Sequence, residues 1–331
     1  MALIGITGGT GYLGGRLAQT LVSHGFSVRL VDDGSGPVHA EDSSIPLYRG
    51  VFPSEESFAW LRDSDVILHL AARSGVVACA KDPEGTRKVN VEGTAQLIEF
   101  CRKEGIPIVF ASSFAVVGVP EKLPIREWTP PNPPHAYAQQ KAEGEKLVRT
   151  LKTREGALGA VIRMSNIFGI YDLHGQKVTK GNVLNQFAEQ ALSGGPLKIF
   201  APGTQRRDYI HIDDVAAHWE AVVRFLLKGH HQEDVPTFNV ASGESRTVFE
   251  LSEMVQSAWS GVHPDKAPLL AEIIENPRAH VEILHPEFTV DAEWTRKTLG
   301  VRCQKNLKAG IHEILGSGQH QVSGSRASMT R

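Results

Sequence analysis

The chain has 331 residues, of which 41% are hydrophobic and 22% are charged, as is usual for a globular enzyme. Its formal net charge of −2 excludes the strongly basic surface that favours nucleic acid or an anionic membrane as a partner. No apolar run reaches the roughly 18 residues of a membrane span.

The first predicted unit is a strand, a glycine-rich turn and a helix. Residues 2–6 are apolar, as in a buried parallel strand, and residues 13–22 have a helical pattern. Between them, Gly9, Gly11 and Gly14 form G-x-G-x-x-G, in which the glycines allow a tight turn, the approach of a pyrophosphate and close helix packing. The helix N-terminus adds free N–H groups. A second strand, 27–31, ends at Asp32, the spacing of a carboxylate that binds an adenosine ribose. A dinucleotide site is predicted, the alternative being a plain strand–helix turn.

Further strands are predicted at 66–70, 108–111 and 160–163, with helices at 89–103 and 138–151 between them. This alternation predicts right-handed crossovers and a parallel sheet. After Gly169 the alternation stops, although 238–241 has the pattern of a strand that returns to the main sheet.

We therefore expect an α/β fold, a Rossmann doubly wound parallel sheet with a smaller α/β substrate-binding domain. The expected dinucleotide-binding domain covers 1–169, with returning segments at about 208–241. The expected substrate-binding domain covers 170–207 and 242–315. Residues 316–331 are rich in Gly, Ser and Gln without periodicity, which predicts a disordered tail.

Tyr137 and Lys141 form Y-x-x-x-K at the start of a predicted helix, so both side chains lie on one helix face. An ammonium near a phenol favours the phenolate, and we expect Lys141 to lower the pKa of Tyr137 toward neutrality. Tyr137 would then act as an acid/base toward a sugar or alcohol hydroxyl. Ser112 and Ser113 directly follow the predicted strand 108–111, at the sheet edge where open α/β folds bind ligands. Taken without the other motifs, these two serines favour the alternative of a plain strand-end turn.

Taken together, these motifs resemble the extended short-chain dehydrogenase/reductase family, and within it the nucleotide-sugar epimerases and dehydratases. The resemblance covers about residues 3–301. In chain order, the motifs that carry it are Gly8-x-x-Gly11-x-x-Gly14, His69-Leu70-Ala71-Ala72, Ser112-Ser113-x-x-Val116-x-Gly118, Tyr137-x-x-x-Lys141, Arg163-x-x-Asn166-x-x-Gly169 and the run from Arg207 to Ala216.

Similarity to UDP-galactose 4-epimerases implies roles for the matched residues. Ser113, Tyr137 and Lys141 would be catalytic, and Lys141 would also hold the nicotinamide ribose. The residues implied to bind NAD are Gly8, Gly11, Tyr12, Leu13, Gly14, Asp32, Leu70, Ala71, Ala72, Asn90, Tyr137 and Lys141. Those implied to bind a nucleotide-diphosphate sugar are Ser113, Asn166, Asn182, Arg207 and Arg278. Arginine suits this task because its planar fork binds phosphate oxygens in pairs.

Three positions depart from the family pattern. Val117 replaces a tyrosine near the site, and Val51-Phe52 replaces an aspartate and an apolar residue that recognise adenine. Ala279-His280 follows Arg278 where Gly-Asp is usual, so the substrate nucleotide can differ from UDP.

The resemblance implies oxidation of a sugar C4 hydroxyl by bound NAD, and the loop after Ser113 bears on the fate of the oxidised sugar. A 4,6-dehydratase needs an acid there, whereas this chain has Phe114 and Ala115. Asp32, with no arginine close behind it, favours NAD over NADP. We therefore expect an NAD-dependent nucleotide-sugar 4-epimerase. A 4-ketoreductase or dehydrogenase of the same family is the alternative, and a non-catalytic NAD-binding scaffold is a further one.

Assembly and location are also expectations. The resemblance implies a homodimer through helices 89–103 and 138–151, and Ala95, Leu97, Ile98 and Cys101 give the first helix more apolar positions than one buried face needs. The cysteines, Cys79, Cys101 and Cys303, lack zinc-ligand spacing and favour reduced thiols in a cytoplasmic protein. The first strand begins almost at Met1, so we expect no signal peptide.

Overall fold

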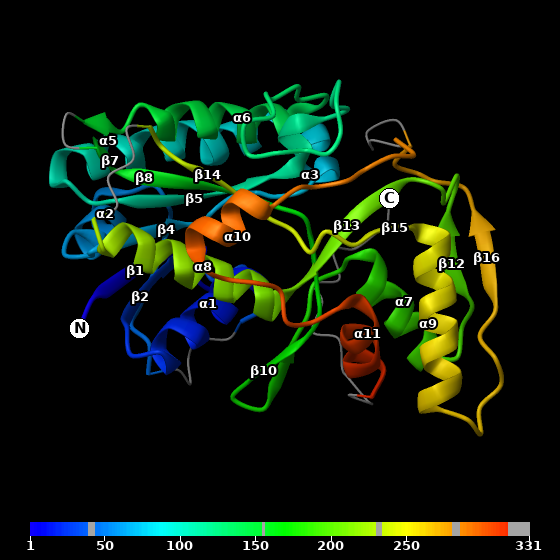
Figure 1. Ribbon diagram of the computed structural model, residues 1–331. Coiled ribbons are helices and arrows are strands. Elements are labelled where there is room, and N and C mark those ends of the chain that lie inside the picture. Colours follow the sequence, from blue (N-terminus) through cyan, green and yellow to red (C-terminus); the bar gives the residue numbers. More distant parts are fainter. Residues whose placement is uncertain (39–43, 154–155, 230–233, 280–284, 317–331) are drawn as a thin grey trace.

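The computed structural model describes residues 1–38, 44–153, 156–229, 234–279 and 285–316. Its centre is a parallel sheet of seven strands in the order β14-β8-β5-β4-β1-β2-β3 (Figure 1). The strands are β1 (Leu3–Thr7), β2 (Ser27–Asp32), β3 (Leu47–Arg49), β4 (Val66–His69), β5 (Ile108–Ser113), β8 (Gly159–Met164) and β14 (Thr237–Val240). The predicted doubly wound sheet is confirmed, with β3 as a strand that the sequence pattern did not reveal.

Helices cover both faces of this sheet (Figure 1). One face carries α1 (Tyr12–Ser23), α8 (Ile212–Leu227) and α10 (Glu293–Leu299), packed over a core that includes Trp219 and Phe238. The other carries α2 (Glu55–Leu61), α5 (Thr94–Glu104) and α6 (Ala136–Arg149), over a core that includes Phe100 and Phe110. Burial on both faces explains why the strands read as continuous apolar runs.

The strand order reverses between β1 and β4, which are neighbours in the sheet although two strands separate them in sequence. In open α/β sheets, ligands bind beyond the carboxyl ends of the strands at such a switch point. Here those ends are Thr7, which leads into the glycine turn, and His69, which leads into Leu70-Ala71-Ala72. The fold therefore places two of the sequence motifs side by side.

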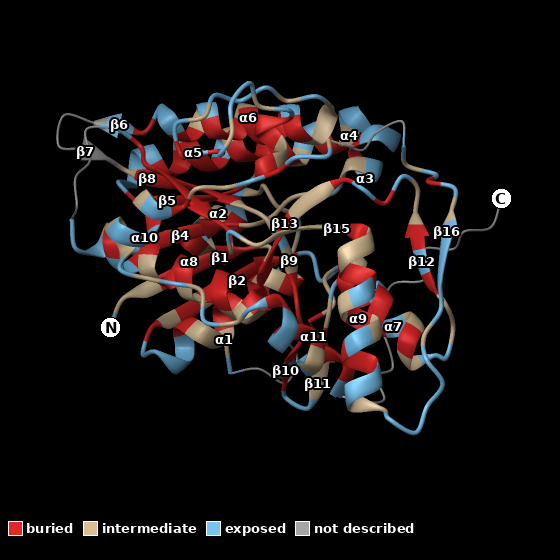
Figure 2. Cartoon of the chain, turned by 45° about the vertical axis from the view of Figure 1, so that its right-hand side comes forward, coloured by how far each residue is buried: buried red, intermediate tan, exposed pale blue. Residues whose placement is uncertain are grey.

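A second group of elements packs around its own core, which includes Phe168, Phe187 and Trp259. Its sheets are β9 (Asn166–Phe168) with β13 (Arg206–His211) and β15 (Ser245–Thr247), and β12 (Leu197–Phe200) with β16 (Ala271–Ile274). Its helices are α7 (Val183–Leu192), α9 (Val248–Val262) and α11 (Leu307–Gly316). In Figure 2, β16 forms an exposed edge, whereas buried residues alternate with more exposed ones along β12.

Short elements complete the chain. They are α3 (Val76–Lys81), α4 (Pro83–Arg87), the π-helical turn η2 (Lys88–Gly93), the 3-10 turn η3 (Phe114–Val117), and the strands β6 (Lys152–Thr153), β7 (Gly156–Ala157), β10 (Tyr171–Leu173) and β11 (Gln176–Val178). The single helix predicted at 89–103 is thus a π-helical turn followed by α5. The tail expected to be disordered lies, from residue 317 onward, outside the described residues.

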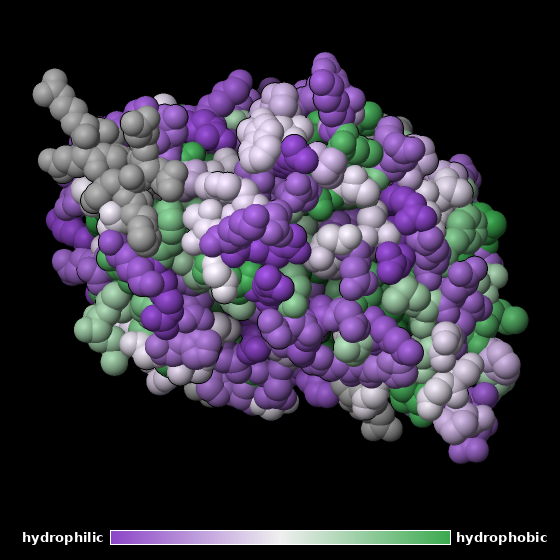
Figure 3. All heavy atoms as spheres, viewed as in Figure 1, coloured by the Kyte–Doolittle hydropathy of each residue, from purple (hydrophilic) through white to green (hydrophobic). Residues whose placement is uncertain are grey.

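The face shown in Figure 3 is mostly hydrophilic, with hydrophobic residues in small separate groups. Among the described residues, no helix is long and apolar enough to cross a membrane. Leu97, Ile98 and Cys101, taken from the sequence as surplus apolar positions on α5, are 0–2% exposed and belong to the core beneath the helix. Counting them as surplus was therefore wrong, and they give no support for a dimer, because the chain buries these side chains by itself.

Candidate active site

The turn between β1 and α1 is tightly packed around its glycines. Gly8 has a φ of +74°, a conformation that costs glycine little, and its N–H donates to the Val31 carbonyl at 2.8 Å. A Cβ on Gly14 would lie 2.2 Å from the Gly8 carbonyl oxygen. Helix α1 therefore begins directly against the turn, which only glycine at position 14 permits.

The groups around this turn fit a dinucleotide. The N-cap of α1 is Gly11, and no side chain caps the helix, so its first N–H groups and its dipole suit a phosphate. Asp32 accepts hydrogen bonds from the Thr10 N–H at 3.1 Å and the Gly34 N–H at 2.7 Å, one on each carboxylate oxygen. Each oxygen keeps further acceptor capacity, which suits a ribose hydroxyl.

Leu70 and Ala71 form the opposite wall of the turn through their backbone. A Cβ on Gly8 would lie 2.7 Å from the Ala71 nitrogen and 2.9 Å from the Leu70 carbonyl carbon. Ala72 follows them, half-buried. Leu13 is also half-buried and packs on the core.

The Tyr12 side chain makes its contacts outside the glycine turn. Its hydroxyl donates to the Gly169 carbonyl at 2.9 Å, and the Tyr171 hydroxyl donates to the Tyr12 carbonyl at 2.9 Å. The Tyr12 ring is buried against the Tyr171 ring, with centroids 5.9 Å apart. Tyr12 thus joins the glycine turn to the second group of elements, and its side chain is committed to that contact.

Asn90 lies in the π-helical turn η2 and holds the chain that follows Ala72. Its side-chain oxygen accepts from the Arg73 N–H at 2.8 Å, and its nitrogen donates to the Arg73 carbonyl at 3.0 Å. The same nitrogen donates to the Gln140 side chain at 2.7 Å. Asn90 is itself buried, and it supports the expected cofactor crevice by holding the backbone of Arg73 in place.

Ser113, Tyr137 and Lys141 meet at the carboxyl end of β5. The Ser113 hydroxyl oxygen accepts from the Ala115 N–H at 3.2 Å and shares a hydrogen bond with Tyr137 near the start of α6. Ser112 has a different role, because its hydroxyl donates to buried Glu145 at 2.7 Å. The two serines of the motif are thus separated into one that faces Tyr137 and one that anchors α6.

The expected lowering of the Tyr137 pKa was wrong in this structure. Burial raises the pKa of Tyr137 to about 12 and outweighs the hydrogen bond from Ser113, which lowers it. The Lys141 ammonium donates instead to the Ala111 carbonyl at 2.7 Å and lies 5.0 Å from the centre of the Phe110 ring. Burial lowers the pKa of Lys141 to about 8.

Lys180 is a cation of this region that sequence reasoning missed. It lies just before Asn182, the N-cap of α7, and its charge contributes to the lowered pKa of Lys141. Burial also lowers the pKa of Lys180 itself. No motif marks this position, so only the fold reveals that two lysines lie near one another.

The two asparagines expected to bind substrate also make contacts within the fold. Asn166 donates to the Asp208 carbonyl at 3.1 Å and is exposed on β9. Asn182 caps α7 by accepting from the Asn185 N–H at 2.9 Å, and its nitrogen donates to the Ile167 carbonyl at 2.9 Å. Asn182 therefore fixes the start of α7 at the strand that carries Asn166.

The two arginines lie over aromatic rings. The Arg207 guanidinium carbon is 5.9 Å from the centre of the Phe288 ring, and Phe288 packs edge-on against Phe114, the residue after Ser113. This chain of contacts links Arg207 to the loop that follows Ser113, the serine expected to be catalytic. Arg278 lies over Phe200, at the end of β12, with 5.0 Å between the guanidinium carbon and the ring centre.

The departures from the family pattern have structural outcomes. Val117 is fully buried and joins Phe114 and Phe288 in a small apolar cluster, so packing replaces the polar contact of a tyrosine. Val51 is 72% exposed. His280 lies outside the described residues.

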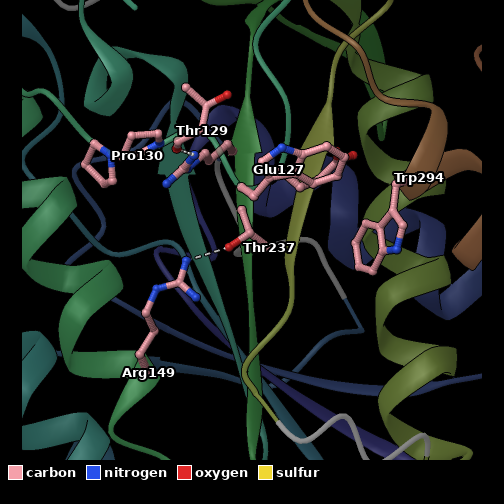
Figure 4. A pocket seen from close by; sticks show the side chains of 9 residues that line it. Glu127, Thr129, Pro130, Arg149, Thr237 and Trp294 are labelled. Carbon is pink, nitrogen blue, oxygen red and sulfur yellow. Dashed lines mark hydrogen bonds between the residues drawn. The ribbon is translucent and has the colours of Figure 1, made fainter.

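A pocket of about 400 Å³ lies elsewhere, at the β14 edge of the sheet (Figure 4). Arg149 crosses it to the Thr237 hydroxyl at 2.7 Å, and Trp294 forms another wall. The buried Arg163 pairs with Glu145 and with the Thr129 carbonyl. Both arginines of this pocket therefore already have hydrogen-bond partners within the fold. Its lining residues are Glu127, Trp128, Thr129, Pro130, Pro131, Arg149, Arg163, Thr237 and Trp294.

The sequences of several curated relatives align with most of this chain. A UDP-glucose 4-epimerase of Azospirillum brasilense is 32% identical over 240 residues, 68% of this chain and 69% of the relative. A UDP-glucose 4-epimerase of Mycolicibacterium smegmatis is 30% identical over 313 residues, 89% of this chain and 96% of the relative. A dTDP-glucose 4,6-dehydratase of Mycobacterium tuberculosis is 29% identical over 235 residues, 68% of each chain.

Solved structures share the fold. The UDP-glucose 4-epimerase of Thermotoga maritima with UDP-glucose and that of Thermus thermophilus with NAD both have a TM-score of 0.77 and 24% identity. Each comparison covers 95% of this chain and 97% of the other. The model of the NAD dependent epimerase/dehydratase family matches residues 4–241, the part that holds the glycine turn, Asp32, Tyr137 and Lys141. This chain therefore belongs to the NAD-dependent epimerase/dehydratase family, and its cofactor is NAD.

Proposed function

We propose that this protein is a nucleotide-sugar 4-epimerase that oxidises and re-reduces C4 of its substrate. The observation that carries the proposal is the grouping of Ser113, Tyr137 and Lys141 at the carboxyl edge of the sheet, the edge that also carries the glycine turn, with an apolar loop after Ser113. That loop, η3, presents Phe114, which is buried, and Ala115. This loop carries no acid for elimination of water, which supports return of the hydride to the sugar over a 4,6-dehydratase reaction.

NAD, when bound, supplies the hydride acceptor, and the side chains of this chain orient the substrate and move the proton. Because the Ser113 oxygen already accepts from the Ala115 N–H, its own proton is available to Tyr137. Donation to the phenolic oxygen stabilises the phenolate, the form that accepts the proton of the sugar hydroxyl. The Lys141 ammonium adds positive charge on the same helix, held by the Ala111 carbonyl.

The proposed substrate is a nucleotide-diphosphate sugar. Arg207 is the group best placed to bind the diphosphate, because its stacking on Phe288 connects it to the Ser113 loop. Arg278, Asn166 and Asn182 are proposed to complete this site. The relatives named for UDP-glucose support this class of substrate.

The experiment that tests the reaction uses purified protein with no added cofactor. It is incubated with UDP-, dTDP-, GDP- and CDP-sugars, and the products are identified by NMR, with Tyr137→Phe as the inactive control. Interconversion of C4 epimers in wild type alone supports the proposal. A 4-keto-6-deoxy product would show a dehydratase, and turnover that requires stoichiometric reduced cofactor would show the alternative 4-ketoreductase.

We further propose that residues 1–169 with 208–241 form the cofactor-binding domain, and 170–207 with 242–315 the substrate domain. The separate core around Phe187 and Trp259 supports this division, and Phe168 of β9 and Tyr209 of β13 join that core from the cofactor-binding part of the chain. We also propose a homodimer through α5 and α6, on the family resemblance alone. Light scattering at micromolar concentration should give about twice the 36.1 kDa chain mass, and a monomer at that concentration would refute the proposed dimer.

We also propose a reducing, cytoplasmic location, which the free thiols of Cys79, Cys101 and Cys303 support.

A further inference from the structure

His69 is a buried imidazole whose two nitrogens both have partners. It ends β4 and is 1% exposed, between the rings of Phe52 and Phe110, whose centroids are 5.4 and 5.9 Å from its own. Its Nδ1 is 2.8 Å from the Thr7 hydroxyl oxygen, and its Nε2 is 2.9 Å from the Thr94 hydroxyl oxygen. Thr7 ends β1, so His69 joins the two strands on either side of the switch point to the start of α5.

The partners of Thr94 determine where the proton of His69 lies. The Thr94 hydroxyl donates its single proton to the Asn90 carbonyl, 2.7 Å away, because a carbonyl oxygen can only accept. The Thr94 oxygen must therefore accept from His69, which places the imidazole proton on Nε2. In the neutral ring Nδ1 then accepts, and the Thr7 hydroxyl donates to it.

The hydrogen bonds continue from Asn90 to the helix that carries the catalytic residues. The Asn90 side chain donates to the Gln140 oxygen at 2.7 Å, and Gln140 directly precedes Lys141 on α6. The Gln140 nitrogen donates to the Thr86 hydroxyl at 3.0 Å and to the Pro83 carbonyl at 3.1 Å. Gln140 is buried, and both the oxygen and the nitrogen of its side-chain amide form hydrogen bonds. It therefore fixes α6 against η2 and α4.

At its other end the chain of hydrogen bonds reaches the cofactor turn. The Thr7 oxygen accepts from the Ala71 N–H at 3.2 Å, and Ala71 packs against Gly8. Asn90 holds both backbone groups of Arg73, two residues further on. The wall of the dinucleotide crevice and the catalytic helix are thus parts of one continuous buried network.

We propose that His69 is a positioning residue, which as the neutral Nε2–H tautomer connects the NAD-binding turn to the helix bearing Tyr137 and Lys141. It touches neither cofactor nor substrate. A buried histidine that only satisfies its own polarity would stabilise the fold equally well, but its hydrogen bonds would be without effect on the affinity for NAD. The two interpretations therefore differ in a measurable quantity.

The first test uses the wild-type protein. Long-range ¹H–¹⁵N NMR, with His69 assigned by comparison with His69→Asn, should show a neutral Nε2–H ring that does not titrate between about pH 5 and pH 9. Burial and the nearby Lys141 charge lower the pKa of His69 to about 3, which keeps the ring neutral over this range. An Nδ1–H tautomer, or a ring that titrates within the range, would overturn the proposal.

The second test compares buried threonines by calorimetry with NAD. Thr94→Val leaves the His69 N–H and the Asn90 carbonyl without this partner, and we expect the Kd for NAD to rise about tenfold, or about 1.4 kcal/mol. Thr94→Ser keeps the hydroxyl and should stay within about twofold of wild type.

Thr295→Val is the matched control. Thr295 is also fully buried, but its hydroxyl joins Glu127 to Asn239 at the far edge of the sheet. This variant loses similar hydrogen bonds and should bind NAD within about twofold of wild type. Equal Kd values for Thr94→Val and either wild type or Thr295→Val would show that the network only stabilises the fold. Should Thr94→Val fail to fold, Thr94→Ser still decides, because a tenfold weaker binding in that variant contradicts the proposal.

Discussion

Replacing Arg163 by methionine should destabilise the protein through the carboxylate it leaves behind. Arg163 is 1% exposed and Glu145 2% exposed, and two guanidinium nitrogens bind the two carboxylate oxygens at 2.9 and 2.8 Å. Removing one partner of a buried ion pair costs about 3–5 kcal/mol, because the other charge stays buried. In Arg163→Met, Glu145 keeps the Ser112 hydroxyl at 2.7 Å and the half-exposed Arg149 at 3.9 Å. We therefore expect a loss near the lower end of that range at pH 7.

The reverse substitution, Glu145→Leu, should also destabilise the protein, because the Arg163 guanidinium that it leaves buried stays charged.

Urea unfolding followed by fluorescence measures these differences. The double variant Arg163→Met/Glu145→Leu should regain most of the loss, remaining about 1–3 kcal/mol below wild type for the Ser112 hydroxyl and Thr129 carbonyl it leaves unpaired. A single variant as stable as wild type, or a double variant no better than Arg163→Met, would refute the argument from a buried uncompensated charge.

The other predictions concern the site. Tyr137→Phe should lower kcat by about 10²–10⁴ while calorimetry finds unchanged NAD affinity, and more than about one per cent residual activity would remove Tyr137 as acid/base. NAD should bind more tightly than NADP, and Asp32→Asn should narrow the difference, because the carboxylate repels a 2′-phosphate. Arg207→Ala should raise KM for the sugar nucleotide by about tenfold or more, because loss of a charge-assisted hydrogen bond costs about 1.5–3 kcal/mol. Arg206→Ala is the control, since Arg206 pairs with Glu250. If Arg207→Ala and Arg206→Ala have equal KM values for the sugar nucleotide, Arg207 does not belong to the substrate site. Burial lowers the pKa of Lys141 to about 8, below its unfolded value, so the stability of wild type relative to Lys141→Met, measured by urea unfolding, should rise with pH from about 8 to about 10.5.

The sequence was sufficient for the sheet because each central strand is buried on both faces and therefore apolar throughout. It missed β3 and α2, where short elements mix polar and apolar residues. It also missed the π-helical turn around Asn90, since an apolar period of 3.6 does not reveal one extra residue per turn.

Within the candidate site, the sequence could predict residues that belong to motifs, such as Ser113 and Tyr137. It could not predict whether Lys141 would lower the pKa of Tyr137, because that depends on burial and on the Ala111 carbonyl, which competes for the ammonium. Lys180 and Phe288 belong to no motif, and only the fold brings them to the site.

The reciprocal bonds between Tyr12 and the segment Gly169 to Tyr171 have a consequence for synthesis of the protein. The Tyr12 hydroxyl reaches a carbonyl 157 residues further along the chain. At about 5–20 residues per second, a ribosome needs roughly 8–30 s to make that partner after Tyr12 itself. During this interval the nascent N-terminus carries Tyr12 without its partner. The contact that joins the glycine turn to the segment Gly169 to Tyr171 can therefore form only after more than half of the polypeptide has been translated.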